Sequence, residues 1–134
     1  MVSRFDVFFA FARNGLTHKE IETILAQFTE LAQGITFTSG KLEHDPLNTH
    51  ILDQQITLML QCSVLFVDMS VSNRNYIGAV VEMVKAKEAG MPIVVYAGKT
   101  GYEQNNSLLY LTTDVHTDYA EAIKKVEEHI GKHQ

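Results

Sequence analysis

Residues 64–70 read Val-Leu-Phe-Val-Asp-Met-Ser, and this stretch decides the fold class. Four consecutive apolar residues are followed by an acidic residue and, two positions on, by a hydroxyl residue. A strand that is apolar on both faces needs cover on both sides, which is typical of a parallel sheet between two layers of helices. The stretch therefore predicts a buried parallel strand that ends in polar side chains.

The residues before this strand alternate between apolar runs and helical periods. Residues 5–11 (FDVFFAF) form an apolar run that stops at a turn signal. Thr17 lies three residues before Glu20, which is the spacing of a capping box. In chain order we expect a strand over 5–11, a helix from 17 to about 34, a strand over 35–38, a polar loop over 39–45 and a helix from Asp45-Pro46 to about Leu60.

The residues after the central strand continue the same alternation. We expect a polar loop over 72–75, a helix over 76–89, a strand over 93–96, a long loop over 98–107, a strand over 114–116 and a helix over 118–130. The element order predicts one α/β domain over residues 1–134. We expect a doubly wound, three-layer, flavodoxin-like fold with a five-stranded parallel sheet of strand order 2-1-3-4-5.

Composition narrows the classes of partner. Of the 134 residues, 46% are hydrophobic and 20% charged, and the formal net charge is -5, which argues against a nucleic-acid polymer as partner. Cys62 is the single cysteine, so the sequence offers no disulfide framework and no thiolate metal cluster. No segment approaches the roughly 18 apolar residues of a membrane span. We expect a soluble, cytoplasmic protein that acts on a small molecule and has no membrane partner.

Several common catalytic signatures are absent from the sequence. It contains no GxGxxG, no GxxxxGK[ST], no HExxH and no GxSxG pattern. These absences disfavour dinucleotide, P-loop, zinc-peptidase and serine-hydrolase sites, and we expect neither a cofactor nor a metal. The side chains that remain as candidates for catalysis are the carboxylates of Asp and Glu residues.

Glu82 is the sharpest candidate, because it lies among apolar residues in the first turns of a predicted helix. A helix N-terminus favours an ionised carboxylate by about 0.3 to 1 kcal/mol, which suits a nucleophile. Gly78, one turn earlier, would leave room for a ligand. The alternative interpretation is an exposed glutamate that pairs with Lys85, three residues on. The pattern alone leaves both open.

Ligands of such sheets bind beyond the carboxyl ends of the strands at the switch point, here between the first and third strands. Arg13 follows the first strand, where it could hold a phosphate or lie on the surface. Asp68 ends the third strand, where it could orient a ligand or, more simply, cap the following turn. Asp53 lies on the second helix, where a solvated carboxylate is the simpler interpretation. The switch-point rule thus nominates three candidate segments, over 12–15, 68–78 and 98–107.

Taken together, these residues resemble the nucleoside 2-deoxyribosyltransferase superfamily, which includes the 2'-deoxynucleoside 5'-monophosphate N-glycosidases. The resemblance is strongest from Asp53 to Tyr96, about a third of the chain. The matching pieces are Asp53 on a helix, VLFVDMS over 64–70, the G-x-x-x-E pattern over 78–82 and GMPIV over 90–94.

The resemblance implies that Glu82 attacks the anomeric carbon, while Asp53 handles a proton or orients the attack. A covalent deoxyribosyl-glutamate would then react with water in a hydrolase or with a second base in a transferase. This is double displacement through an oxocarbenium-like state, as in retaining glycosidases.

Two further segments resemble the monophosphate branch. The stretch from Phe11 to Gly15 resembles a loop that wraps the 5'-phosphate, although Phe11 stands where the hydrolases carry a serine. The segment from Asn106 resembles one that enters the neighbouring subunit's site, which implies a homodimer or higher oligomer with shared sites. Tyr76 stands where the transferases carry a base-reading aspartate. The residues expected around the substrate are Phe11, Arg13, Asn14, Gly15, Asp68, Ser70, Tyr76, Gly78, Asn106, Ser107 and Leu108.

Two other functions fit the same sheet. A binding or sensing module would hold a nucleotide without cleaving it, because a fold by itself does not fix a function. A glutamate-dependent NAD glycohydrolase would release nicotinamide from NAD. The sequence does not decide between a phosphorylated and an unphosphorylated substrate.

Overall fold

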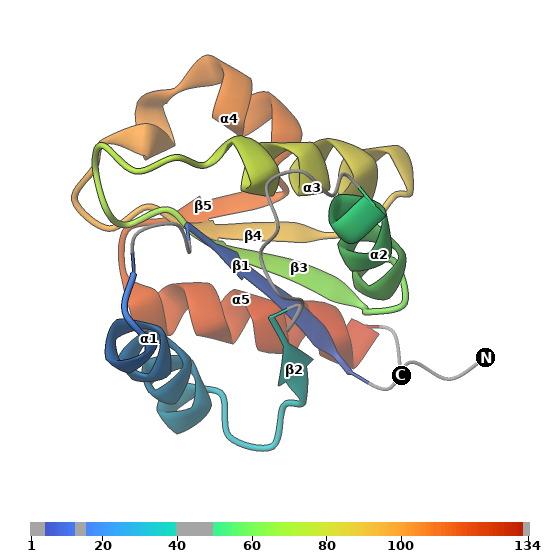
Figure 1. The fold of residues 1–134 in the computed structure, drawn as a ribbon, viewed down its shortest axis with the longest axis horizontal. Coiled ribbons are helices and arrows are strands. Elements are labelled where there is room, and N and C mark those ends of the chain that lie inside the picture. Colours follow the sequence, from blue (N-terminus) through green and yellow to red (C-terminus); the bar gives the residue numbers. More distant parts are fainter. Residues whose placement is uncertain (1–4, 13–15, 40–49, 133–134) are drawn as a thin grey trace.

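The computed structural model describes residues 5–12, 16–39 and 50–132. A five-stranded sheet lies between two layers of helices (Figure 1). Its strands are β1 Val7–Phe11, β2 Phe37–Thr38, β3 Val64–Asp68, β4 Ile93–Tyr96 and β5 Asp114–His116. Every pairing is parallel and the order is β2-β1-β3-β4-β5. The predicted fold class and strand order are confirmed.

The helices divide between the two faces of the sheet, as the alternation of side chains along each strand requires. They are α1 His18–Leu31, α2 His50–Met59, α3 Ile77–Glu88, the 3-10 helix η1 Tyr102–Gln104, α4 Asn106–Leu111 and α5 Tyr119–Lys132. On β3, Val64 and Phe66 pack with residues of α1 and α5. Leu65 and Val67 pack with residues of α2, α3 and α4. We call these the α1/α5 face and the α2/α3 face.

An aromatic cluster forms the centre of the α1/α5 face. The ring centroids of Phe9 and Phe28 lie 4.9 Å apart, and those of Phe28 and Phe66 lie 5.3 Å apart. All three side chains are fully buried. Offset and edge-on aromatic pairs add to the free energy that area burial alone supplies. This cluster fixes α1 against the two central strands, whose carboxyl ends form the switch point.

The start of α1 follows the predicted capping box. The backbone N–H of Glu20 donates to Thr17 Oγ1 at 3.1 Å, and the backbone N–H of Thr17 donates to Glu20 Oε1 at 3.0 Å. Two of the N–H groups that an α-helix leaves without intrahelical partners are thereby satisfied.

The main correction concerns residues 98–107, for which we expected a loop without helices. This stretch contains η1 and the first residues of α4. Asn105 caps α4, because its Oδ1 accepts a hydrogen bond from the backbone N–H of Leu108 at 3.0 Å. A helix of six residues is too short to give a periodic apolar signal.

Smaller differences concern element ends and the second helix. β2 covers two residues, not the four of the predicted strand. The expected helix start at Asp45-Pro46 lies outside the described residues. Within the described part of the chain, no helix is both long and apolar enough to cross a membrane.

Candidate active site

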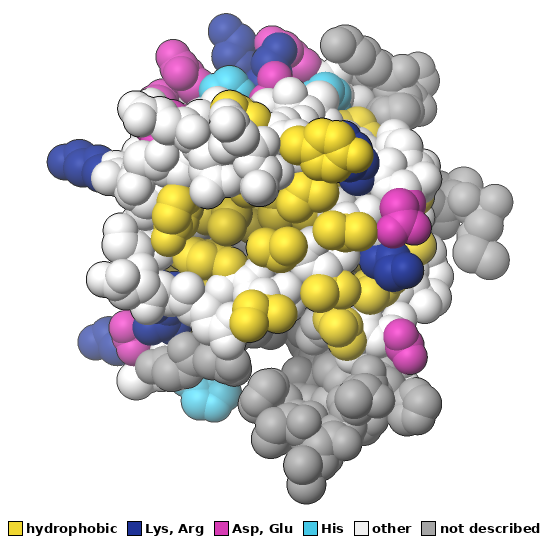
Figure 2. Space-filling model, turned by 90° about the horizontal axis from the view of Figure 1, so that it is seen from above, with side chains coloured by type: hydrophobic (Ala, Val, Ile, Leu, Met, Phe, Trp, Pro, Cys, Tyr) yellow, Lys and Arg dark blue, Asp and Glu magenta, His cyan; other side chains and the backbone are white. Residues whose placement is uncertain are grey.

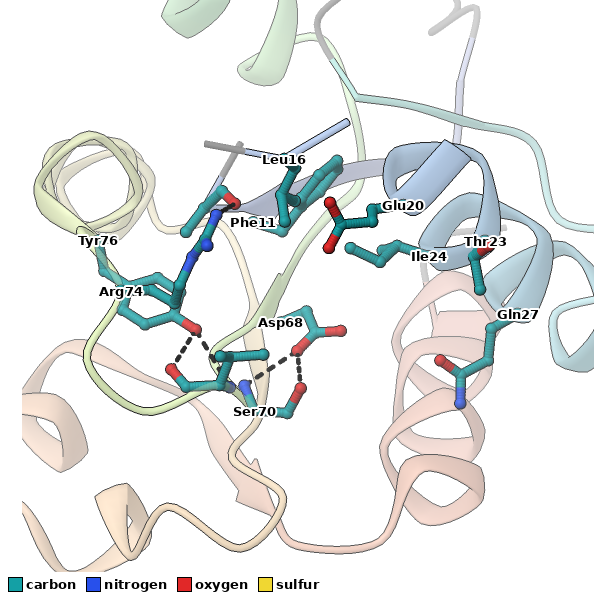
Figure 3. Close-up of a pocket in the computed structure, with 12 residues that line it drawn as sticks. Phe11, Leu16, Glu20, Thr23, Ile24, Gln27, Asp68, Ser70, Arg74 and Tyr76 are labelled. Atoms are coloured by element: carbon teal, nitrogen blue, oxygen red, sulfur yellow. Dashed lines mark hydrogen bonds between the residues drawn. The ribbon is translucent and has the colours of Figure 1, made fainter. Parts of the chain in front are cut away.

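The switch point lies where β1 and β3 pair, with Phe11 opposite Asp68 at their carboxyl ends. The chain leaves β1 toward α1 on one face of the sheet and leaves β3 toward α3 on the other (Figure 1). A cavity of about 400 Å³ opens between α1 and the segment that follows β3. We call it the α1 cavity. Its lining residues are Phe11, Ala12, Leu16, Glu20, Thr23, Ile24, Gln27, Asp68, Ser70, Val71, Arg74 and Tyr76 (Figure 3).

Asp68 lies at the base of the α1 cavity and also closes the turn after β3. Its Oδ1 accepts hydrogen bonds from the Ser70 backbone N–H at 3.0 Å and from the Ser70 hydroxyl at 2.6 Å. The expected turn-capping role is therefore confirmed. Burial raises the pKa of the Asp68 carboxyl, and the two Ser70 hydrogen bonds offset part of that rise.

Tyr76 and Arg74 line the wall of the α1 cavity that lies across from α1 and is formed by the segment after β3. The Tyr76 hydroxyl donates to the Val71 carbonyl at 2.9 Å and accepts from the Val71 backbone N–H at 3.3 Å. Arg74 Nη2 donates to the Ala12 carbonyl at 3.3 Å, which ties this wall to the end of β1. These contacts fix the shape of the segment between β3 and α3.

The α1 wall was not expected from the sequence. Glu20, Thr23, Ile24 and Gln27 line the cavity from one side of this helix, and Leu16 lines it from just before the helix begins. Their spacing places them on a single stripe. Topology could have predicted this wall, because α1 is the helix that follows β1 at the switch point. Arg74 lies in the candidate segment over 68–78 but was not among the expected site residues, because a cation in a polar loop carries no further signal in the sequence.

Glu82 is only 6% exposed. It belongs to the buried row of α3, with Ala79, Met83 and Ala86, that faces the sheet. The alternative of an exposed glutamate is therefore wrong, and Lys85 lies on the exposed side of the helix. α3 packs on the α2/α3 face of the sheet, while Asp68 shares the α1/α5 face with Phe66 by alternation.

The structure brings four of the expected site residues together around the α1 cavity: Phe11, Asp68, Ser70 and Tyr76. The described lining of this cavity does not include Glu82 or Asp53. Asp53 is exposed on α2, which packs beside α3 in the same helical layer (Figure 1). The two expected catalytic carboxylates therefore lie on neighbouring helices of one layer.

The remaining expected residues have separate surroundings. Gly78 is exposed, and an added Cβ there would meet no described atom within 4 Å. Asn106 and Ser107 are exposed at the start of α4. Leu108 is 7% exposed and packs in the core of its own chain. Arg13, Asn14 and Gly15 lie outside the described residues.

We expect Asp68→Asn to change how stability depends on pH. The raised pKa means that folded Asp68 holds its proton more tightly than unfolded Asp68, so the stability of the unaltered protein falls as pH rises through this titration. Asparagine does not titrate and keeps an acceptor oxygen for Ser70. The free energy of unfolding of the variant minus that of the unaltered protein should increase as the pH rises through and above the ordinary aspartate pKa of about 3.9. Urea unfolding at several pH values measures it, and a constant difference would contradict the raised pKa.

One solved structure with this fold is that of Clostridium botulinum CMP N-glycosidase, BcmB. It is 11% identical to this chain, the match covers 92% of this chain and 98% of that one, and the TM-score is 0.55. At this identity the likeness shows the fold. No protein-family model matches the chain, and no curated protein matches it either.

Proposed function

We propose that this protein cleaves or exchanges the N-glycosidic bond of a 2'-deoxynucleoside or its 5'-monophosphate, with Glu82 as the nucleophile. The burial of Glu82 on a helix that begins at the switch point carries the proposal. Burying a carboxylate costs folding free energy, so such a group is a functional-site candidate. The solved structure with the same fold is named for an N-glycosidase, which supports the same class of reaction.

In the proposed first step, the Glu82 carboxylate bonds to C1' of the sugar as the C1'–N bond breaks. The base leaves with the electron pair of that bond and takes a proton, for which Asp53 is the proposed donor. In the second step, water or a second base attacks C1', its proton passes to Asp53, and Glu82 leaves as a carboxylate. Each step passes through an oxocarbenium-like state, which a nearby carboxylate stabilises.

The phosphate-binding part of the proposal rests on two segments. Arg13, Asn14 and Gly15 follow β1, where a guanidinium and backbone N–H groups suit a 5'-phosphate. Ser107, exposed at the start of α4, is proposed to contact the phosphate in a neighbouring subunit. A requirement for the phosphate follows if both segments act.

The experiment that tests the reaction is a chromatographic screen of deoxynucleosides and deoxynucleoside monophosphates, with and without a second free base. Ribonucleotides, including CMP, form the comparison series. We expect free base from at least one deoxy substrate. A new nucleoside in the presence of the second base would identify a transferase, and its absence a hydrolase. No base from any compound after long incubation at high protein concentration would reject the proposal.

A second candidate function is a nucleotide-binding or sensing module. The observation that favours it is the position of Glu82 outside the described lining of the α1 cavity. This function predicts equilibrium binding of a deoxynucleotide, without any release of base.

We also propose that the protein forms a homodimer or higher homo-oligomer. Apolar side chains gather on the surface of α3 and α4 (Figure 2). Ile77 is 71% exposed and Tyr110 is 69% exposed. The exposed members of this apolar face are Ile77, Val80, Val84, Leu109 and Tyr110. Contiguous exposed apolar surface of this kind marks interaction sites, and α4 is the segment that carries Ser107.

We expect Ile77→Asp to weaken self-association by about tenfold or more, since a C2 interface would meet the introduced charge twice. Sedimentation equilibrium over a range of concentrations measures the dissociation constant. Leu31→Asp is the matched control, because Leu31 is an exposed apolar residue on α1, away from the apolar face. Equal association of the two variants would place the interface elsewhere.

A further inference from the structure

We propose that the α1 cavity is the subsite for the base of the substrate, and that Asp68 selects bases that carry an exocyclic amino group. The inference rests on the proposed N-glycosidic function, and it adds a base subsite and a specificity residue to it. The substrate would lie across the carboxyl ends of β1 and β3, with its base on the α1/α5 face and its sugar toward α3.

The size and lining of the α1 cavity suit a flat heterocycle. Its volume of about 400 Å³ lies in the range of small-molecule pockets, which are mostly apolar with a few placed polar groups. Phe11 at the end of β1, Leu16 just before α1 and Ile24 on α1 supply apolar surface. The Phe11 ring is held edge-on against Phe9, with centroids 5.4 Å apart.

Asp68 presents a fixed acceptor to this space. Its Oδ1 is held by both Ser70 hydrogen bonds, which orient the carboxyl group. Figure 3 shows the second oxygen pointing toward the α1 wall. A partly desolvated carboxylate oxygen gains most from a donor that a ligand brings, because water solvates it poorly. The ligand should therefore offer an N–H group at this point.

The atoms beside each N–H group of a base decide whether that group suits the Asp68 carboxylate. In uracil and thymine the N3–H donor is flanked by two carbonyl oxygens, which would repel the Asp68 carboxylate. The amino groups of adenine and cytosine project from the ring beside a ring nitrogen, which accepts a hydrogen bond.

Gln27, on the α1 wall, is the proposed partner for the ring nitrogen that lies beside the amino group of the base. The hydroxyl hydrogen of Thr23 is already used on the Lys19 carbonyl, at 2.9 Å. The amide of Gln27 offers an N–H donor for the ring nitrogen beside the amino group.

Binding to Glu82→Gln protein tests the specificity without turnover. The ligand pairs are 2'-deoxyadenosine against purine 2'-deoxyriboside, and 2'-deoxycytidine against its analogue without the 4-amino group. Calorimetry should show the amino compound of each pair binding about tenfold tighter or more. Adding Asp68→Asn should remove the preference, because the asparagine oxygen stays on Ser70 and its N–H group faces the ligand. Asp114→Asn is the matched control, a half-buried aspartate on β5 outside the cavity lining.

A second pair of variants tests the location. Thr23→Trp should fill the α1 cavity and abolish binding, while Glu22→Trp, at the adjacent exposed position of α1 outside the cavity lining, should leave it intact. Equal binding by these two variants, an amino preference that survives Asp68→Asn, or no binding of any nucleoside would overturn the inference.

The outcomes separate this inference from the proposed reaction. Amino-selective binding that needs Asp68, with no base released by the unaltered protein, would leave the base subsite standing and remove the glycosidase proposal. Base release that Thr23→Trp leaves unchanged would do the opposite.

Discussion

Glu82→Gln should lower the rate of base release from the best substrate by a factor on the order of a thousand or more, because a carboxamide is a poor nucleophile. The substitution keeps the size of the side chain and removes its charge. Glu82 is 6% exposed, so the change also removes the cost of burying a carboxylate. The variant should therefore fold as stably as the unaltered protein. Initial rates by chromatography, together with thermal unfolding, measure the two effects separately.

Glu88→Gln is the matched control for this loss of activity. Glu88 ends the same helix but is exposed, and it lies away from the switch point. We expect unchanged turnover from this variant. Loss of activity in both variants would point to the net charge or to α3 as a whole, and retained turnover in Glu82→Gln would reject Glu82 as the nucleophile.

A direct readout of the intermediate strengthens the same prediction. Rapid quenching during turnover should leave a deoxyribosyl ester on the peptide that contains Glu82, visible as added mass. The ester should be absent from Glu82→Gln protein. An adduct on a different carboxylate would keep the mechanism and move the nucleophile.

The strands of this fold were accessible from the sequence because their signals are local. β4 and β5 occupy the predicted ranges, and β3 extends the predicted apolar run by the residue Asp68. Continuous apolar runs need cover on both faces, so their presence fixes both the parallel sheet and its two helical layers. The strand order then follows from the rules that govern crossover connections.

The candidate site was only partly accessible, because its walls depend on how helices pack. Asp68 and Tyr76 stand at strand and helix ends, so topology alone predicts their place near the switch point. Gln27 stands ten residues into α1, and only the rotation of that helix against β1 turns it toward the cavity. Leu108 and Leu109 are adjacent and equally apolar, yet one is buried and the other is exposed.

Glu82 shows what packing adds to a pattern. Its sequence surroundings fit either a buried carboxylate or an exposed ion pair with Lys85. The two interpretations differ by a rotation of α3 about its axis, which a sequence of mixed apolar residues leaves undetermined. Burial of Ala79, Met83 and Ala86 sets that rotation and carries Glu82 inward with them.

The largest loss of stability is expected from Phe66→Ala, which should lower the free energy of unfolding by about 3 to 5 kcal/mol. Phe66 is fully buried at the centre of β3, and its ring lies 5.2 Å from Phe9, 5.3 Å from Phe28 and 5.9 Å from Tyr119, between centroids. Removing the Phe66 ring leaves a cavity that cannot collapse, because β1 and β4 hold β3 in place on both sides. Urea unfolding with an unchanged m-value measures the loss.

Phe37→Ala is the comparison for this loss. Phe37 is half-buried on the two-residue strand β2, although its ring lies 4.7 Å from Phe28. A smaller loss is expected there, because an outer strand relaxes toward its neighbours and water already reaches part of the ring. Phe66 also lies two residues before Asp68 on the same face, so the cavity left by Phe66→Ala undermines the support of the carboxyl group at the base of the α1 cavity. Equal losses for the two variants would mean that the aromatic cluster is not the centre of stability, and that α1 is held against the switch point by other contacts.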